Sequence, residues 1–132
     1  MRFSNAQLVN IFCDARPDYI LERIVFNNAG AYCEDYNGGN WSIARCGEFV
    51  YVVPPTGTYT VTNPNNYYRG TMDQNSYGAA LTLLIINKLI WDAHESAKMD
   101  LCQRLTEMFY SLRDAVYNDS NLNGGEIAAF LD

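Results

Sequence analysis

The apolar residues of this chain change their spacing twice, and each change marks a boundary between helices and strands. From residue 18 to 36 they recur about every 3.6 residues, which indicates an amphipathic helix. From residue 41 to 72, short runs rich in β-branched and aromatic residues alternate with turn residues, a pattern typical of antiparallel strands. Helical spacing returns after residue 73. Because strands and helices occupy separate parts of the chain, we expect an α+β fold, a four-stranded antiparallel β-meander with an N-terminal helix and two or three C-terminal helices packed on it.

The expected elements have the following bounds. Strands are expected at 41–46, 49–53, 58–62 and 67–72, and a helical turn at 4–7. A helix that is hydrophobic over much of its circumference follows residue 73 and ends near Lys98, so we expect it at the centre of the core. A second helix carries an apolar repeat from Leu101 to Val116, and a last short helix begins at Asn123. Gly38 and Gly39 are expected to end the N-terminal helix and to lead tightly into the sheet.

Length and charge restrict the function classes. The 132 residues suit one domain spanning residues 1–132, and 15 acidic against 9 basic residues leave a net charge of −6. That balance argues against binding to duplex DNA or to anionic lipid. It also argues against mimicry of DNA, because a domain about 35 Å wide would have to match the roughly 20 charges of an equal length of duplex.

The cysteine and histidine residues predict no metal site and no cofactor. The four cysteines are scattered without a Cys-x-x-Cys pair, and the single histidine, His94, cannot complete a zinc set. The first residues lack the pattern of a signal peptide, and no apolar run approaches the roughly 20 residues that span a bilayer, so we expect a cytoplasmic protein. An enzyme centred on His94 with Asp92 and Glu95 is the weakest hypothesis, because no nucleophile is marked beside them.

A second hypothesis is a module that binds single-stranded nucleic acid. Arginine and tyrosine side chains on one sheet face can contact phosphates and stack on bases. The predicted strands carry such residues: Arg45, Tyr51, Tyr59, Tyr67, Tyr68 and Arg69. Ordinary cross-strand pairing is the alternative interpretation, and the acidity of the chain favours it.

One segment of the chain resembles the sequence of a known protein family. Residues 33–41, with Cys33, Tyr36, the two glycines and Trp41, resemble the Cys-x-x-Tyr-x-Gly-Gly-x-Trp stretch of the KlcA/ArdB antirestriction family. The resemblance continues in order through residues 49–54, 70–72 and 110–113 and closes at 126–132, where that family ends in a short helix with a terminal aspartate. It covers about residue 14 to the end of the chain.

The resemblance implies a protein of plasmids, phages or genomic islands that relieves DNA restriction by host type I enzymes without catalysis of its own. We expect it to act by contact with a host restriction enzyme, since tyrosine, tryptophan and arginine are enriched at interface hot spots. The candidate contact residues are Tyr36, Trp41, Arg45, Tyr51 and Asp132. Burial in the core is the alternative for Trp41 and Tyr51, and inhibition of another antiphage defence nuclease is the alternative target.

Overall fold

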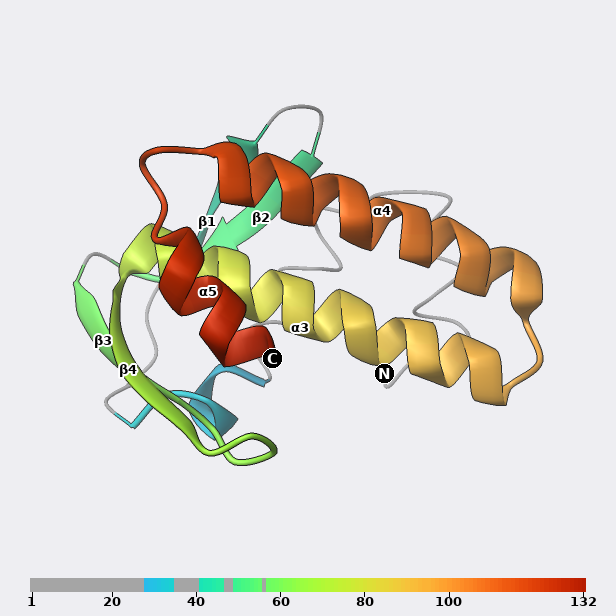
Figure 1. Cartoon of the computed structure of the whole chain (residues 1–132), viewed down its shortest axis with the longest axis horizontal. Helices are drawn as coiled ribbons and strands as arrows, with labels where there is room; N and C mark the ends of the chain where they lie inside the picture. The colour runs from blue at the N-terminus through green and yellow to red at the C-terminus, as the bar shows by residue number, and fades with distance from the viewer. Residues whose placement is uncertain (1–27, 35–40, 47–48, 56) are drawn as a thin grey trace.

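The computed structural model describes residues 28–34, 41–46, 49–55 and 57–132, and it confirms the α+β class (Figure 1). The elements in chain order are η1 (Ala29–Ala31), β1 (Ser42–Cys46), β2 (Phe49–Val53), β3 (Thr58–Asn63), β4 (Tyr68–Asp73), α3 (Gln74–Glu95), α4 (Met99–Asn118) and α5 (Gly124–Leu131). The strands and the last three helices lie close to their predicted bounds, because their hydrophobic patterns are strong and turn residues separate them.

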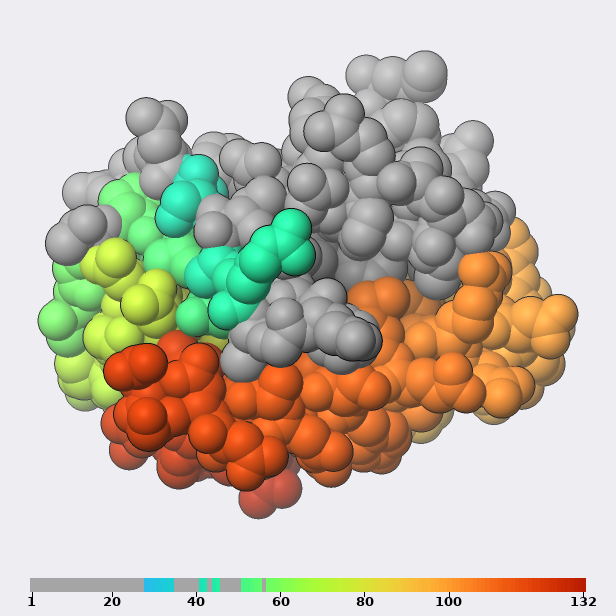
Figure 2. Space-filling model, turned by 90° about the horizontal axis from the view of Figure 1, so that it is seen from above, coloured from blue at the N-terminus to red at the C-terminus, as the bar shows by residue number. Residues whose placement is uncertain are grey.

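Helix α3 is the centre of the molecule, as its sequence predicts. Every residue from Ser76 to Ile86 is buried, so the helix contacts other elements on all its faces. Helix α4 runs beside it and buries one stripe that includes Leu105 and Leu112, and α4 forms one side of the molecular surface in Figure 2. None of the helices in the described ranges is both long and apolar enough to cross a membrane.

The four strands form two separate two-stranded sheets, so the prediction of one four-stranded meander is wrong. Strand β1 pairs antiparallel with β2, in a register that places Arg45 opposite Val50. Strand β3 pairs antiparallel with β4, and Val61 lies opposite Gly70. Both hairpins match the sequence expectation, and only the pairing of β2 with β3 differs.

Other partners occupy the edges at which β2 and β3 would have met. The backbone N–H of Val52 in β2 donates to the Thr82 hydroxyl of α3, and a Cβ on Gly78 would collide with the Val52 carbonyl. The backbone of α3 therefore lies directly against β2. On β3, the Thr62 N–H donates to the Tyr32 carbonyl, and the backbone N–H of Glu34 donates to the Thr60 carbonyl. Because these edge groups already form hydrogen bonds, pairing of β2 with β3 would satisfy no further backbone groups at these positions.

The segment before β1 departs from the predicted helix. Cys33 forms an antiparallel bridge with Val61, so the predicted helix does not run through Cys33, and a short 3-10 helix at Ala29–Ala31 precedes the bridge. The Tyr77 hydroxyl holds this turn by donating to the Ala29 carbonyl at 2.8 Å. The rest of the predicted helix, the turn at 4–7, the glycines 38 and 39 and the hairpin turn at 47–48 lie outside the described residues.

Candidate protein-contact site between α4 and α5

Helix α5 is held in place by polar contacts from the β3–β4 hairpin and from α3. The Tyr68 hydroxyl of β4 donates to the Glu126 carboxylate. The side-chain amide of Asn63, which is buried, donates to the Phe130 carbonyl at 2.8 Å. At the other end of the helix, the Asn123 N–H donates to the Ser76 hydroxyl at 2.9 Å. These contacts set the direction of α5 and so the place of Asp132, which follows it.

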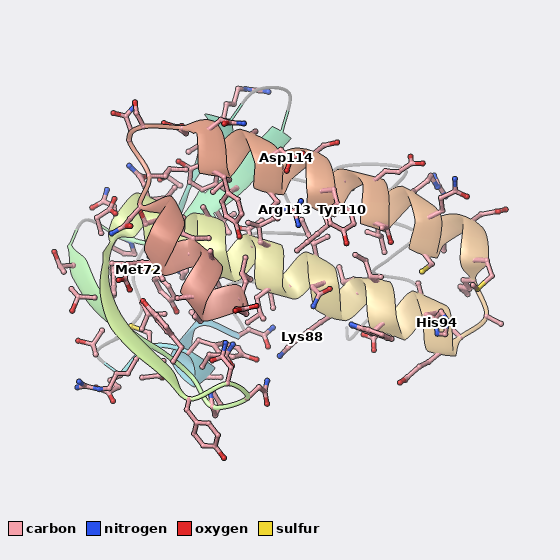
Figure 3. The ribbon with its side chains drawn as sticks, viewed as in Figure 1. Met72, Lys88, His94, Tyr110, Arg113 and Asp114 are labelled. Atoms are coloured by element: carbon pink, nitrogen blue, oxygen red, sulfur yellow. The ribbon has the colours of Figure 1, made fainter. Side chains whose placement is uncertain are left out.

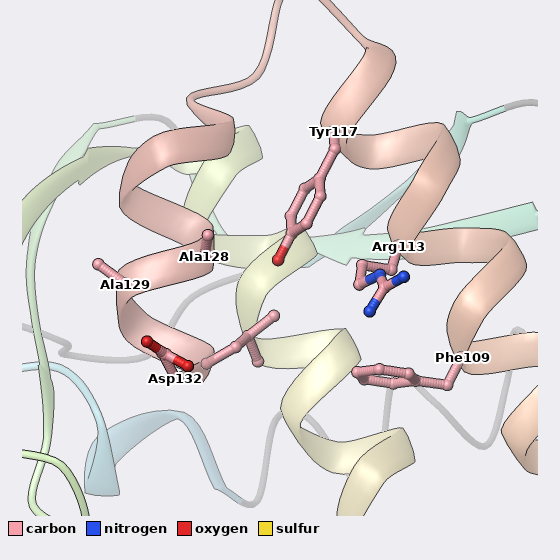
Figure 4. Close-up of a pocket in the computed structure, with 7 residues that line it drawn as sticks. Phe109, Arg113, Tyr117, Ala128, Ala129 and Asp132 are labelled. Carbon is pink, nitrogen blue, oxygen red and sulfur yellow. The ribbon is translucent and has the colours of Figure 1, made fainter.

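Beside α5 lies a cavity of about 400 Å³ whose other wall is α4 (Figure 4). From α4 it is lined by Phe109, Arg113 and Tyr117, which follow each other at intervals of four and therefore share one stripe of the helix. The α5 wall consists of Ala128, Ala129, Leu131 and Asp132. The two alanines keep the space open, because larger side chains would fill it.

Arg113 keeps hydrogen-bonding capacity in this cavity. Its guanidinium carbon lies 4.5 Å from the ring centroid of Tyr110 and 6.0 Å from that of Tyr117, so two aromatic rings flank the cation. One terminal nitrogen lies 3.3 Å from the Asp114 carboxylate. Its Nε is buried and has no hydrogen-bond partner among the described residues. A buried donor without a partner costs free energy, and a bound group that accepts the hydrogen bond would recover it.

Asp132 and Tyr117 are electrostatically coupled across the cavity. Burial raises the pKa of the Tyr117 phenol above its ordinary value, the Arg113 cation lowers it, and the Asp132 carboxylate raises it further. In Figure 4 the Tyr117 hydroxyl extends toward the space between α4 and α5. The cavity thus combines a guanidinium and a phenol, a carboxylate, and an apolar surface from Phe109 and Leu131. Such a set suits recognition of a polypeptide segment, whose backbone and side chains present both donors and acceptors.

The predicted contact residues fall in different places. Asp132 is exposed, and of the four predicted contact residues that the structure describes it is the one that lines the cavity. Trp41 is half-buried against the core, and Arg45 is exposed on β1. Tyr51 is 5% exposed, so in this structure its side chain contributes to the core rather than to a surface. Tyr36 lies outside the described residues.

The contact residues predicted from the sequence do not include the α4 side of the cavity. Its signal was present, because Phe109, Arg113 and Tyr117 stand four residues apart and flank the buried stripe of Leu112 and Val116. An arginine between two large aromatics one turn away in each direction is a recognisable surface pattern. No sequence pattern predicts that α5 faces this stripe and places Asp132 beside it.

The predicted aromatic and arginine face is not assembled as one surface. Arg45 lies on the β1–β2 sheet, whereas Arg69 lies on β4 and binds the Glu34 carboxylate through Nε at 3.3 Å and a terminal nitrogen at 3.1 Å. Tyr59 is buried, and Tyr68 turns its hydroxyl to Glu126. Tyr67 differs from its neighbours because its side chain is almost fully exposed.

The surroundings of His94 are those of a helix end. His94 lies near the C-terminus of α3 (Figure 3), where its ring meets Trp91 edge to face at 6.0 Å. Burial raises the pKa of the neighbouring Asp92, and the Glu95 carboxylate raises it further. Among the described residues, no three histidine, cysteine, aspartate or glutamate side chains gather as metal ligands.

Comparison with known proteins identifies the family. The sequence model of the antirestriction protein family matches residues 34–132, which include β1 to β4 and both walls of the cavity. The chain is also 30% identical over 95 residues to a protein of Escherichia coli (strain K12) named antirestriction protein YubI. The match covers 71% of this chain and 64% of YubI, so the chain spans less than two thirds of the length of that relative. Since the family match extends over most of the sequence, the chain belongs to the antirestriction protein family.

Proposed function

We propose that this protein relieves host type I restriction of incoming mobile DNA and that it belongs to the KlcA/ArdB branch of its family. The observation that carries the proposal is the family match over residues 34–132. The Cys-x-x-Tyr-x-Gly-Gly-x-Trp stretch at residues 33–41 supports the narrower placement. On this proposal the protein acts in the cytoplasm, against a restriction enzyme of the host.

The proposed mechanism is contact with a protein, without catalysis by this chain. A net charge of −6 is far below the roughly 20 charges of a duplex segment as long as the domain, so a mechanism that copies the field of DNA is not favoured. A contact mechanism needs a surface with aromatic and arginine anchors, because such residues dominate the binding energy of protein interfaces. The α4–α5 cavity supplies this combination in Phe109, Arg113 and Tyr117, and the Tyr110 ring flanks the Arg113 guanidinium outside the cavity lining.

Each group in the cavity has a role in this contact. The guanidinium of Arg113 would donate to an acceptor of the partner, and the flanking rings would contribute contact area at low entropic cost. The Asp132 carboxylate would accept a hydrogen bond from a donor of the partner. A partner that places an acceptor and a donor at this spacing satisfies both walls at once, which favours one orientation of binding.

The direct test is phage restriction in cells. Cells with a type I restriction enzyme are infected with unmodified phage, with and without this protein, and plating efficiency is measured. We expect the protein to raise the plating efficiency of unmodified phage and to leave modified phage unchanged, because modified DNA is not restricted. Unchanged plating against every type I system tried would refute the proposed target. Relief of another defence nuclease would instead favour the alternative inhibitor function.

Matched variants test the surface. Arg113→Met removes the cation but keeps an unbranched side chain, and Asp132→Asn removes one negative charge with little change of shape. We expect both variants to fold and to relieve restriction less than the wild type. The controls are Arg104→Met and Asp100→Asn, which make the same changes at exposed positions of α4 outside the cavity lining. If Arg113→Met and Asp132→Asn relieve restriction as well as their two controls and the wild type do, the partner does not use this cavity.

A further inference from the structure

Tyr67 combines an unusual backbone conformation with an exposed ring. It lies in the connection between β3 and β4, its side chain is 94% exposed, and its φ is +62°. The preceding turn is closed by the Asn66 N–H, which donates to the Asn63 carbonyl at 3.3 Å. A residue that follows such a turn in the left-handed region is ordinarily glycine or asparagine, because a bulky side chain is strained there. Folding therefore gains nothing from a tyrosine at this position.

The loop around Tyr67 is nevertheless held firmly. The Asn63 side chain accepts a hydrogen bond from the Asn65 N–H at 3.1 Å, and the Asn66 side chain accepts one from the Tyr68 N–H at 3.0 Å. The amides of Asn63 and Asn66 also donate to the Phe130 carbonyl, at 2.8 Å and 3.1 Å. A strained residue persists where its surroundings impose its conformation, and such residues are concentrated at functional sites. The ring of Tyr67 is thus projected from a rigid support.

The loop adjoins the α4–α5 cavity. The Asn66 amide donates to the Ala129 carbonyl at 3.3 Å, and Ala129 lines that cavity. The hairpin end and the end of α5 lie near each other in Figure 1 as well. The hairpin end and one wall of the cavity are therefore joined through the backbone of α5. A partner that covers the cavity and extends around the end of α5 would meet the hairpin end.

From this geometry we infer that Tyr67 is an anchor residue that inserts into an apolar pocket on the same restriction enzyme that covers the cavity. The inference rests on the proposed function, because it names the same partner. A preorganised ring loses little conformational freedom on binding, which is how a strained position can improve affinity. Its hydroxyl requires a polar group at the bottom of the pocket, as buried tyrosines do.

The absence of charged side chains at residues 63–68 favours a protein over a nucleic acid as the partner of Tyr67. Residues 63–68 carry no charged side chain, and the nearest cation in sequence, Arg69, binds Glu34 at 3.1 Å. Binding of single-stranded nucleic acid needs basic groups along the backbone in addition to stacking rings. A neutral hairpin end with one projecting aromatic fits a concave protein surface better.

The test compares Tyr67→Gly, Tyr67→Phe and the wild-type protein. Affinity for a purified type I restriction enzyme is measured by interferometry, and Tm by thermal unfolding. We expect Tyr67→Gly to weaken binding at least about 30-fold, the loss typical of a hot-spot residue, while its Tm equals or exceeds that of the wild type. Tyr67→Phe keeps the ring and should lose less affinity. Trp91→Ala, which removes an exposed ring near the far end of α3, is the control and should bind like the wild type.

The outcomes distinguish a failure of the inference about Tyr67 from a failure of the proposed antirestriction function. If the wild type binds and Tyr67→Gly binds equally well, the anchor is refuted and the proposed function stands. If the wild type neither binds nor relieves restriction, both are refuted. A lower Tm for Tyr67→Gly would show that the ring is structural. If Tyr67→Gly loses affinity for a single-stranded oligonucleotide and keeps its affinity for the enzyme, the ring binds nucleic acid and the inference is overturned.

Discussion

The Tyr68 hydroxyl donates a hydrogen bond to the Glu126 carboxylate and so joins β4 to α5 across 58 residues of sequence. The ring of Tyr68 also meets the Phe130 ring edge to face at 5.9 Å, and the Tyr32 ring meets the same Phe130 ring edge to face at 5.9 Å. Burial raises the pKa of the Tyr68 phenol, and the bond to the Glu126 carboxylate raises it further. The hydroxyl therefore stays protonated and remains a donor at neutral pH. This contact fixes the helix that carries Asp132.

Removing this hydrogen bond should destabilise the protein moderately. We expect Tyr68→Phe and Glu126→Gln to show a coupling free energy of about 1 kcal/mol in a double-mutant cycle, because the bond is charge-assisted but only half-buried. Urea unfolding measures it. Tyr110→Phe, an exposed tyrosine on α4, is the control and should change stability by no more than about 0.5 kcal/mol. Additive effects of the two variants would contradict the structural role of the pair.

The contact of α3 with β2 predicts an inverted glycine effect at position 78. Alanine in a helix is ordinarily more stable than glycine by about 1 kcal/mol. In Gly78→Ala the new methyl group would collide with the Val52 carbonyl, so we expect a loss of about 3 kcal/mol in the free energy of unfolding. The comparison is Gly125→Ala in α5, where the closest atom to the new Cβ is 3.8 Å away and no loss is expected. A stabilised Gly78→Ala variant would mean that α3 does not lie against β2.

Thr82 should be needed for its hydroxyl more than for its methyl group. Its oxygen accepts from the Val52 N–H at 3.2 Å and donates to the Gly78 carbonyl at 2.8 Å. Thr82→Val keeps the shape and leaves a buried N–H without a partner, which costs about 1–3 kcal/mol. Thr82→Ser keeps the bond and should lose less. Amide exchange of Val52, followed by NMR, should accelerate in Thr82→Val and stay slow in Thr82→Ser; equal exchange in both would refute the contact.

The cavity predicts two opposite pKa changes at Tyr117. Because the Asp132 carboxylate raises the pKa of this phenol and the Arg113 cation lowers it, Asp132→Asn should lower the pKa and Arg113→Met should raise it. NMR titration of labelled tyrosine measures both. The folded-state pKa lies above the ordinary value of 10.0, so the folded state holds the proton more tightly and stability should fall as pH rises above 10.0. Shifts in the same direction would contradict the arrangement of the three residues.

The positions of the elements could be predicted because they depend on local patterns. The buried run of α3 from Ser76 to Ile86, the β-branched residues of β3 and the start of α5 near Asn123 each occupy one short stretch of sequence. The predicted helix at 18–36 is wrong at Cys33, which follows the helical spacing and yet forms a bridge with Val61. There a contact with a distant strand prevails over the local preference.

The candidate site was predictable only in part. The sequence prediction of contact residues includes Asp132 but not Arg113 or Tyr117, which line the same cavity. No local pattern states that α5 faces this stripe of α4. That depends on the contacts of Asn63, Tyr68 and Ser76 with α5, all made by residues more than 40 positions away.

The amino-acid order accounts for the α+β class, the two hairpins, the central helix and the membership of the antirestriction family, since hydrophobic period and motif spacing are properties of neighbouring residues. The folded chain alone shows that the strands divide into two sheets and that Arg113 and Asp132 share a cavity. The reason is physical: a strand edge or a helix face accepts whichever partner satisfies its hydrogen bonds and buries its apolar surface. Here those partners, α3 for β2 and residues 32–34 for β3, lie far away in the sequence.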